Sequence, residues 1–314
     1  MEKLALHGGT PVRETMLSYG QQWISEEDIE AVVRTLKSDF ITQGPAIERF
    51  ERTVADYVGA KYAVAFASGT AALHGACFAA GIGPGDEVIT TPITFLASSN
   101  CVLYQGGTPV FADIDARTYN LSPEACERKI TERTKAIIPV DFTGQPVEID
   151  RLRELADRHG LVVIQDAAHS LGADFAGRKI GTWADMTMFS FHPVKHVTSA
   201  EGGMIVTDNE QYYRKLQLFR SHGMTKEPNE LLHNDGPWYY EMQELGYHYR
   251  MTDMQAALGS SQMGRLDSFV QRRREIAAAY TEAFRDIEGL TVPYQHPNAN
   301  SSWHLYVLRF NEEV

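Results

Sequence analysis

The sequence predicts an α/β protein with a largely parallel sheet that helices cover on both faces. Two observations predict this fold: apolar runs of strand length alternate with helical patterns, and helix start signals stand where the helices should begin. The seven strand-like runs are 62–67, 87–91, 109–114, 136–141, 161–166, 186–191 and 203–207.

The helix signals fall between these runs. Ser25 with Asp28 three residues later is typical of a capping box before a helix over 29–37. Ser122 followed by Pro123 places a cap before a proline at the first helical position. The turn 83–86, Gly-Pro-Gly-Asp, leads into a strand. Helices and strands are thus predicted in alternation.

The pattern changes after about Met251. A long amphipathic pattern runs over 253–284, and short strand-like pieces follow at 290–292 and 304–310. We therefore expect a large domain with an N-terminal arm over 1–250, and a linker helix with the start of a smaller α/β domain over 251–314. Because the sequence stops just after a strand, we expect that C-terminal domain to be incomplete.

The composition of the chain excludes several classes of function. The 314 residues are 43% hydrophobic and 22% charged, enough for one large core and part of a second. The formal charge of −12 argues against a nucleic-acid partner. The sequence has neither a targeting signal nor an uncharged apolar segment of membrane-spanning length, so we expect a cytoplasmic protein without a membrane partner. Its three cysteines have no metal-ligand or CxxC spacing and fall in helical patterns, so neither a metal site nor a disulfide is expected: Cys77, Cys101 and Cys126.

Two residues carry the strongest chemical signal. Asp166 ends the apolar run 161–166, and Lys195 follows the run 186–191 in a turn that continues into the small and polar stretch 198–203. A carboxylate among apolar residues is costly unless a cation accompanies it, and a desolvated lysine amine becomes nucleophilic. A pyridoxal phosphate enzyme uses this pair, the lysine to form an imine and the acid to keep the ring nitrogen protonated.

A phosphate site is expected beside them. Ser68, Gly69 and Thr70 follow a strand and open a helical pattern, so backbone N–H groups and the positive end of the helix dipole are available to an anion. Taken alone, such a turn is more often a plain helix cap. Its position at the carboxyl end of a strand, like that of Asp166, favours a ligand site.

Other candidates near the pair are less specific. His169 is suited either to hydrogen-bond the cofactor's phenolic oxygen or to pack beneath the ring. Phe95 is suited to stack on the ring, although an aromatic residue after a strand is more often ordinary core. Ser190 can add a hydroxyl to the phosphate or only satisfy the backbone. Gly202 and Gly203 permit a close backbone approach or a simple turn.

Ordered motifs run along nearly the whole chain: Phe40-Ile41-Thr42-Gln43-Gly44-Pro45, Phe50-Glu51, Ser68-Gly69-Thr70-Ala71-Ala72-Leu73, Gly85-Asp86-Glu87-Val88, Asp166-Ala167-Ala168-His169, the Lys195 turn, Arg220-Ser221-His222-Gly223 and Tyr249-Arg250-Met251-Thr252-Asp253-Met254-Gln255-Ala256-Ala257-Leu258-Gly259. With these motifs the sequence resembles the DegT/DnrJ/StrS family of sugar aminotransferases, which are pyridoxal phosphate enzymes of fold type I.

The resemblance implies a role for each matching residue. Lys195 becomes the Schiff-base lysine and Asp166 the partner of the ring nitrogen. The other cofactor-binding positions are Gly69, Thr70, Phe95, His169, Ser190 and Arg250, and the implied substrate contacts are Gln43 and Gly44. The resemblance also implies a homodimer with shared active sites, in which the segment 246–250 reaches the neighbour's phosphate. Many members have asparagine where this chain has His248.

Within the family, some pieces are similar to the transaminases of pseudaminic acid biosynthesis. They are Val140-Asp141-Phe142, Gly144-Gln145-Pro146, the Lys195 turn, Ala200-Glu201-Gly202-Gly203 and Phe219-Arg220-Ser221-His222-Gly223-Met224. The expected reaction moves an amino group from glutamate to C4 of a UDP-linked 4-keto-6-deoxy-N-acetyl sugar, forming UDP-4-amino-4,6-dideoxy-N-acetyl-L-altrosamine. The alternative is amination at C3 or C4 of a dTDP- or GDP-linked keto sugar.

Three further alternatives follow from the same fold. Relatives that dehydrate sugars with pyridoxamine phosphate carry histidine at the lysine position, and Lys195 argues against them. A cysteine desulfurase or another amino acid lyase needs a mobile loop cysteine, whereas these cysteines fall in helical patterns. A regulator that binds pyridoxal phosphate without catalysis is separated by testing whether glutamate bleaches the cofactor's absorbance.

Overall fold

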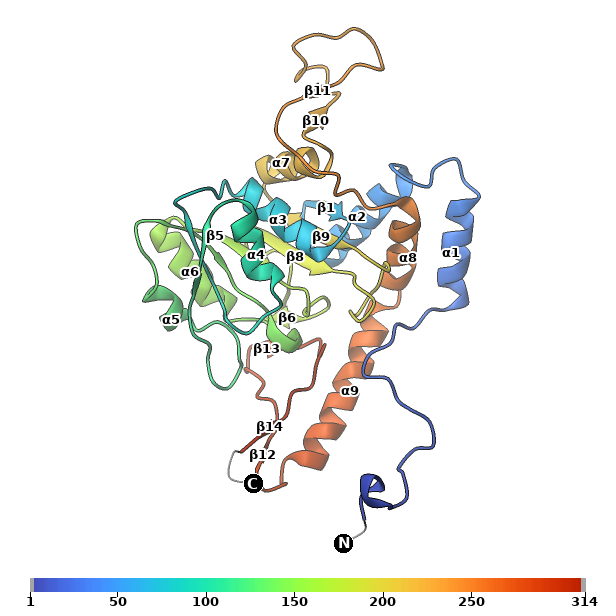
Figure 1. Ribbon diagram of the computed structural model, residues 1–314, viewed down its shortest axis with the longest axis vertical. Helices are drawn as coiled ribbons and strands as arrows, with labels where there is room; N and C mark the ends of the chain where they lie inside the picture. The colour runs from blue at the N-terminus through green and yellow to red at the C-terminus, as the bar shows by residue number, and fades with distance from the viewer. Residues whose placement is uncertain (1–2, 312–314) are drawn as a thin grey trace.

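Seven strands form one mixed sheet at the centre of the structure, a computed structural model that describes residues 3–311 (Figure 1). The strand order is β1-β9-β8-β5-β4-β2-β3, and only β9 runs antiparallel to its neighbours. The strands are β1 (Tyr62–Phe66), β2 (Glu87–Thr90), β3 (Thr108–Phe111), β4 (Thr134–Ile138), β5 (Val162–Asp166), β8 (Met186–Ser190) and β9 (Gly203–Thr207). The largely parallel sheet and its seven strands are confirmed, with ends that differ by at most three residues.

Alternation along the strands gives the sheet two apolar faces. In β1, Ala63 and Ala65 join one core cluster, while Val64 and Phe66 join the other. Successive side chains of a strand point to opposite faces, so a strand that is apolar throughout requires cover on both sides. The helices supply that cover, as the sequence predicts.

Each face has its own set of helices. The first cluster includes residues from α2 (Pro45–Val58), α5 (Pro123–Glu127), α6 (Ile149–His159), α8 (Asp253–Met263) and α9 (Leu266–Phe284). The second includes residues from α3 (Gly69–Ala79), α4 (Ala97–Tyr104) and α7 (Glu210–Arg220). The three cysteines are free and buried within α3, α4 and α5, as expected from their patterns.

The predicted helix starts are confirmed. In α1 (Glu26–Leu36), Ser25 and Asp28 form the reciprocal capping box. The Ser122 hydroxyl accepts the N–H of Ala125 at 3.2 Å at the start of α5. Figure 1 shows α1 at the edge of the molecule beside α8, and the buried Asp28 carboxylate fastens it there through Ser261 and Arg265.

The single long helix expected over 253–284 is wrong. The chain forms α8 and α9 instead, with Gly264 at the end of α8 and Arg265 before α9. There the N–H groups of both residues bond to carbonyls three residues back, so the α-helical ladder is interrupted. Glycine is a poor helix former, and the apolar pattern continues across it without marking the break.

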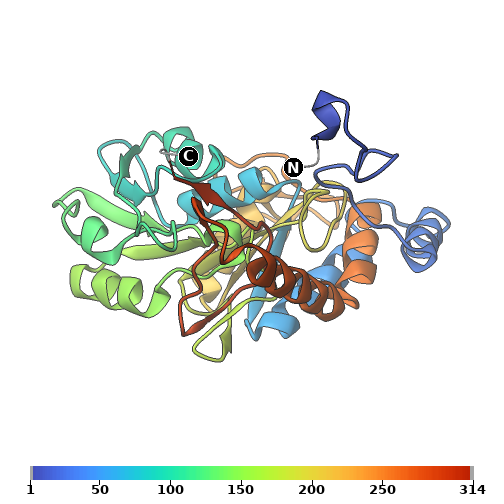
Figure 2. The same cartoon turned by 90° about the horizontal axis from the view of Figure 1, so that it is seen from below.

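The C-terminal segment and α9 lie below the sheet in Figure 1 and in front of it in Figure 2, which is the view from below. Strand β12 (Leu290–Thr291) pairs with β14 (Arg309–Phe310), so the strand expected over 304–310 is much shorter than predicted. Strand β13 (Ala299–Asn300) pairs with β6 (Asp174–Phe175), which also pairs with β7 (Arg178–Lys179). Val314, on which the expected truncation rests, lies outside the described residues, and the two-domain division stays a prediction.

Three small elements complete the fold. The hairpin of β10 (Met224–Thr225) and β11 (Glu241–Met242) projects from the body of the molecule (Figure 1), and two 3₁₀ turns occur at η1 (Ala5–His7) and η2 (Phe142–Gly144). Between residues 3 and 311 no helix combines the length and apolar character that crossing a membrane requires. The cellular location stays a prediction.

Candidate active site

A cavity of about 340 Å³ opens where three strands of the sheet end. Strands β1, β5 and β8 run in the same direction, and the residues at or just after their carboxyl ends meet there. Open α/β sheets bind ligands at this edge. Seven of the predicted residues line the cavity together: Gly69, Thr70, Phe95, Asp166, His169, Ser190 and Lys195.

The loop between β8 and β9 holds Lys195. Its N–H donates to the His192 carbonyl at 2.9 Å, and the loop closes where Phe191 N–H donates to the Gly202 carbonyl at 2.9 Å. A Cβ on Gly203 would overlap the backbone carbonyl of Ser68. Gly203 is thus needed for the close approach of the chain after the lysine loop to the predicted phosphate turn.

Burial changes the acid–base state of Lys195. Desolvation lowers the pKa of its amine to about 8, and the negative charge of Asp166 partly opposes that shift. At mildly alkaline pH, near this pKa, a substantial share of the amine is therefore uncharged. An uncharged amine is the form that attacks a carbonyl carbon and accepts a proton.

The Asp166 side chain is buried, with both oxygens held. Ala168 N–H donates to Oδ1 at 3.2 Å, and the hydroxyl of Ser98 donates to Oδ2 at 2.7 Å. Burial raises the pKa of Asp166, while these two hydrogen bonds and the charge of Lys195 oppose the rise. Among residues 3–311 no cationic side chain forms an ion pair with this carboxylate, so it is suited to a cation from a ligand.

The start of α3 faces the same cavity. The side chain of Ser68 caps the helix by accepting the N–H of Ala71 at 3.1 Å. The N–H groups of the first helical turn have no partners within the helix, and the helix dipole adds positive potential. Gly69 keeps the space free, because a Cβ there would lie 3.3 Å from the Cβ of Ser190. A phosphate group fits this corner.

His169 lines the cavity as a neutral imidazole. Burial first, and then the charge of Lys195, lowers its pKa to about 3. Its Nδ1 is buried without a hydrogen-bond partner among residues 3–311. Its ring lies 4.3 Å, centroid to centroid, from that of His304. Both interpretations of His169, as a donor to a ligand and as a packing group, are compatible with this position.

Phe95 and Ser190 lie at the rim. Phe95 is 73% exposed and precedes α4, so the interpretation of Phe95 as ordinary core is wrong. The Ser190 hydroxyl lies beside Gly69 and accepts the N–H of His192 only at 3.5 Å. Both side chains are thus accessible to a molecule in the cavity.

Three predicted residues lie elsewhere in the same chain. Gln43, Gly44 and Arg250 line a separate cavity of about 380 Å³ that shares no residue with the Lys195 cavity. Arg250 Nε is buried without a partner in the described part of the chain. His248, found where many relatives have asparagine, is exposed and its ring lies 5.4 Å from that of His222.

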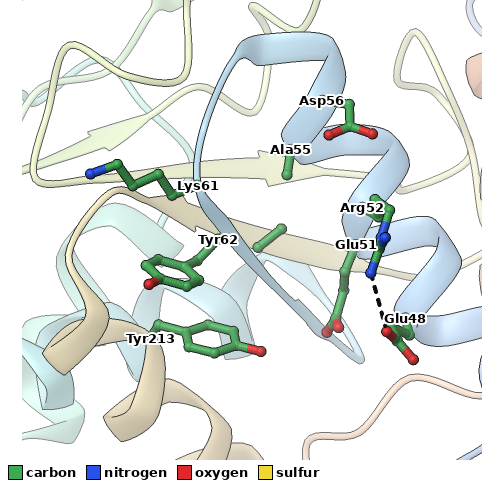
Figure 3. Close-up of a pocket in the computed structure, with 9 residues that line it drawn as sticks. Glu48, Glu51, Arg52, Ala55, Asp56, Lys61, Tyr62 and Tyr213 are labelled. Atoms are coloured by element: carbon green, nitrogen blue, oxygen red, sulfur yellow. Dashed lines mark hydrogen bonds and ion pairs between the residues drawn. The ribbon is translucent and has the colours of Figure 1, made fainter.

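A further cavity of about 300 Å³ lies between α2 and the start of β1 (Figure 3). It contains none of the predicted residues. Tyr62 stacks on Tyr213 with ring centroids 4.6 Å apart, and Arg52 pairs with Glu48 at 3.4 Å. Glu51 pairs with Arg220, which lies outside this cavity, and the remaining charged groups are exposed. We therefore assign no chemistry to the cavity.

Several residues around the cavity are not predicted from the sequence. Ser98 bonds to Asp166, Thr94 bonds to Ser98 at 2.8 Å, and His304 packs on His169. His196 packs on His304 in turn, with ring centroids 5.5 Å apart. Only the position of His196 next to Lys195 offered a signal. The contacts of Ser98 with Asp166 and of His169 with His304 join segments far apart in the chain, and the local contact of Thr94 with Ser98 concerns the site only through Asp166.

The cavity fits pyridoxal phosphate. Its volume is within the range of small-molecule sites. It offers an amine that is partly uncharged, a buried carboxylate without an ion-pair partner in residues 3–311, and a helix start for a phosphate. These features on a mixed sheet of this strand order define a fold type I pyridoxal phosphate enzyme.

Comparison with known proteins gives the family. Residues 22–314 match the DegT/DnrJ/EryC1/StrS aminotransferase family. The spore coat polysaccharide biosynthesis protein SpsC of Bacillus subtilis is 45% identical over 96% of this chain and 77% of its own. PseC of Helicobacter pylori, an aminotransferase of pseudoaminic acid biosynthesis, superposes with a TM-score of 0.87 at 36% identity, over 94% of this chain and 78% of its own.

A third relative has a similar sequence identity and TM-score to those of PseC. The putative sugar aminotransferase Spr1654 of Streptococcus pneumoniae, in its PMP form, has a TM-score of 0.89 at 34% identity, over 95% of this chain and 79% of its own. The chain belongs to the DegT/DnrJ/EryC1/StrS aminotransferase family and is a pyridoxal phosphate-dependent sugar aminotransferase. PseC and Spr1654 are similar to this chain to nearly the same degree, at 36% and 34% identity. The comparisons therefore do not show the expected special similarity to the pseudaminic acid enzymes.

Proposed function

We propose that this aminotransferase moves the amino group of glutamate to C4 of a UDP-linked 4-keto-6-deoxy-N-acetyl sugar. The observation that carries the proposal is the Lys195 amine beside a buried Asp166 in one cavity. The subfamily motifs around Val140 and the Lys195 turn, and the likeness to PseC, support the choice of sugar.

Each residue of the cavity has a separate role in the proposed reaction. Bound pyridoxal phosphate supplies an aldehyde that takes up an amine and a ring that accepts electrons when a neighbouring C–H bond breaks. Asp166 holds the ring nitrogen and keeps it protonated, and the start of α3 with Ser190 holds the phosphate. The Lys195 amine would move a proton from the α-carbon of the amino donor to C4' of the cofactor, and would move it in the opposite direction when the sugar is aminated.

Phe95 and His169 complete the site in this proposal. The exposed ring of Phe95 at the rim contacts the face of the cofactor ring. The neutral imidazole of His169 donates to the phenolic oxygen or packs beneath the ring. Gln43 and Gly44 contact the sugar or the amino donor. The roles of Phe95 and His169 rest on the family resemblance together with the positions described above, whereas those of Gln43 and Gly44 rest on the resemblance alone.

We also propose that the active site is completed across a homodimer. Arg250 lies outside the Lys195 cavity of its own chain, and the segment before it carries exposed apolar side chains such as Leu245 and Tyr247. The hairpin of β10 and β11, which leads into this segment, projects from the body of the molecule (Figure 1) and exposes Trp238 and Met242. Association of two copies would cover these groups and bring Arg250 to the partner's phosphate.

A second candidate is amination of a different nucleotide-linked keto sugar. The 45% identity to SpsC, which is named for spore coat polysaccharide biosynthesis, favours it. In that case the substrate is a dTDP- or GDP-linked sugar that is aminated at C3 or C4.

The test is a substrate panel. The protein, loaded with pyridoxal phosphate, is incubated with glutamate and UDP-, dTDP- and GDP-linked 3-keto and 4-keto sugars, and amino sugars are detected by mass spectrometry. We expect amination of the UDP-4-keto-6-deoxy-N-acetyl sugar and none by Lys195→Ala. Amination of a dTDP- or GDP-sugar alone would select the second candidate. Formation of one 2-oxoglutarate per site without any sugar separates an aminotransferase from a cofactor-binding regulator.

A further inference from the structure

Ser98 is a buried serine of α4 that contacts the carboxylate at the floor of the cavity. Its side chain is 0% exposed, and its hydroxyl donates to Asp166 Oδ2 at 2.7 Å. The Thr94 hydroxyl lies 2.8 Å from the same Ser98 oxygen. Ser98 and Thr94 thus form a chain of two hydroxyls that ends on Asp166.

The direction of the two hydrogen bonds, from Thr94 to Ser98 and from Ser98 to Asp166, follows from the number of hydroxyl protons. Ser98 has one hydroxyl hydrogen, and an ionised carboxylate can only accept. The Ser98 proton therefore points at Asp166, and the Thr94 hydroxyl must donate to Ser98. Hydrogen bonds to a charged acceptor are shorter and stronger than neutral ones, and a chain of them is polarised toward the charge.

The two hydrogen-bonded hydroxyls also connect two parts of the site. Thr94 is the neighbour of Phe95, whose ring is exposed at the rim of the cavity. With Ala168 N–H on Oδ1 and Ser98 on Oδ2, the plane of the carboxylate is fixed from both sides. The position of the Phe95 loop and the orientation of Asp166 are therefore set by one hydrogen-bonded unit.

We propose that Ser98 is a positioning residue, which aims the Asp166 carboxylate at the ring nitrogen of the cofactor and, through Thr94, keeps the Phe95 loop in register with it. This inference rests on the proposed role of Asp166. It makes Ser98 part of the cofactor site, although Ser98 does not line the cavity.

The chain offers a matched control in the next residue. Ser99 is in the same helix and buried, but its hydroxyl donates to the Leu96 carbonyl at 3.1 Å. We expect Ser98→Ala to raise the dissociation constant of pyridoxal phosphate about tenfold, the usual effect of losing a hydrogen bond to a charged group. Ser99→Ala should stay within about twofold, although both variants lose one buried hydroxyl.

A spectroscopic titration separates positioning from general damage. In Ser98→Ala, Asp166 holds the protonated ring nitrogen less firmly, so the ring carries less positive charge. That charge opposes protonation of the nitrogen that joins Lys195 to the cofactor, and in the variant it opposes it less. The pH at which the visible absorbance of the bound cofactor changes should therefore rise, by about half a unit or more. Thr94→Val should shift it in the same direction by less, and Thr94→Ser, which keeps the hydroxyl, should restore it.

Two results would overturn the inference. One is an unchanged affinity and titration in Ser98→Ala. The other is an equal loss of affinity in Ser98→Ala and Ser99→Ala that tracks a lowered unfolding temperature of the cofactor-free protein. Asp166→Ala is the reference for the proposed site: if it binds pyridoxal phosphate as tightly as the wild type, the role of Asp166 itself is wrong, whatever Ser98 does.

Discussion

The carboxylate of Asp253 accepts the backbone N–H of Gly44 at 2.7 Å, and its other oxygen accepts the N–H of Ala46 at 2.9 Å. The first residue of α8 thereby caps the start of α2, from the far end of the chain. Asp253 is 0% exposed, and its charge faces the positive end of the α2 dipole. Gln43, next to Gly44, has a φ of 55° that this clamp holds in place.

Asp253→Asn tests the clamp. An asparagine supplies one acceptor oxygen, and its amide would face an N–H group that needs an acceptor. We expect the free energy of unfolding to fall by about 2 kcal/mol, the cost of a buried donor without a partner. Urea unfolding of the cofactor-free protein measures it, with Asp56→Asn on the exposed face of α2 as the control. Equal stability of both variants would show that the clamp contributes nothing.

The buried pair of Glu51 and Arg220 gives a second stability prediction. Glu51, at the cavity of Figure 3, accepts Ala65 N–H at 2.8 Å and the guanidinium of Arg220, which itself donates to the Ala65 carbonyl at 2.9 Å. Glu51 and Arg220 together provide hydrogen-bond partners for the backbone N–H and carbonyl of Ala65 on the unpaired edge of β1, the terminal strand of the sheet. Arg220→Met should therefore destabilise the protein by about 3 kcal/mol, because it leaves a buried charge without its partner.

Thermal and urea unfolding of Arg220→Met check this value. The comparison is Arg214→Met in the same helix, which breaks an exposed pair with Glu210 and should cost less than about 1 kcal/mol. A similar loss in both variants would contradict the argument from burial.

The sequence predicts the sheet and the centre of the site well, for a physical reason. Strands buried on both faces are apolar throughout, so their ends can be located, and the residues at the ends of parallel strands converge. Asp166 at the end of β5 and Lys195 after β8 are found in this way. Local signals such as the Ser25 capping box are also dependable, since partner and cap lie within one turn.

Contacts between distant segments could not be predicted in the same way. Ser98 and Asp166 are 68 residues apart, and a serine inside an apolar helix gives no sign of its partner. The break at Gly264 is hidden because the apolar pattern is continuous across it. The separation of Gln43 and Arg250 from Lys195 depends on how the chain ends pack, which no periodicity records.

The lowered pKa of Lys195 predicts how its reactivity depends on pH. Only the uncharged amine reacts, so the rate at which a small acylating reagent modifies Lys195 in the cofactor-free protein should rise with pH and level off above about 8. An ordinary lysine would level off near its usual pKa of 10.5. Peptide mass spectrometry follows Lys195 and the exposed Lys61 in the same sample, and a midpoint shared by both would contradict the prediction.

The sign of the Asp166 contribution can be tested in the same experiment. The carboxylate raises the pKa of Lys195 against the stronger effect of burial. Asp166→Asn removes the negative charge and should move the midpoint for Lys195 to lower pH. A midpoint that moves upward would show that the two side chains do not interact as described.

Mixed dimers test whether Arg250 serves the partner's site. We expect Lys195→Ala and Arg250→Ala to be inactive or strongly impaired as separate homodimers. In a heterodimer of the two, one site combines the intact Lys195 of one subunit with the intact Arg250 of the other, if the site is shared. Random mixing makes half of the dimers mixed, each with one intact site, so about a quarter of the wild-type activity should return.

The same mixture distinguishes the opposite arrangement. If Arg250 served the cavity of its own chain, each site in the heterodimer would lack either Lys195 or Arg250, and no activity would return. The separation of the two cavities within one chain favours recovery. Refolding both variants together from urea, with each variant refolded alone as the control, allows the subunits to exchange, and the sugar assay measures the result.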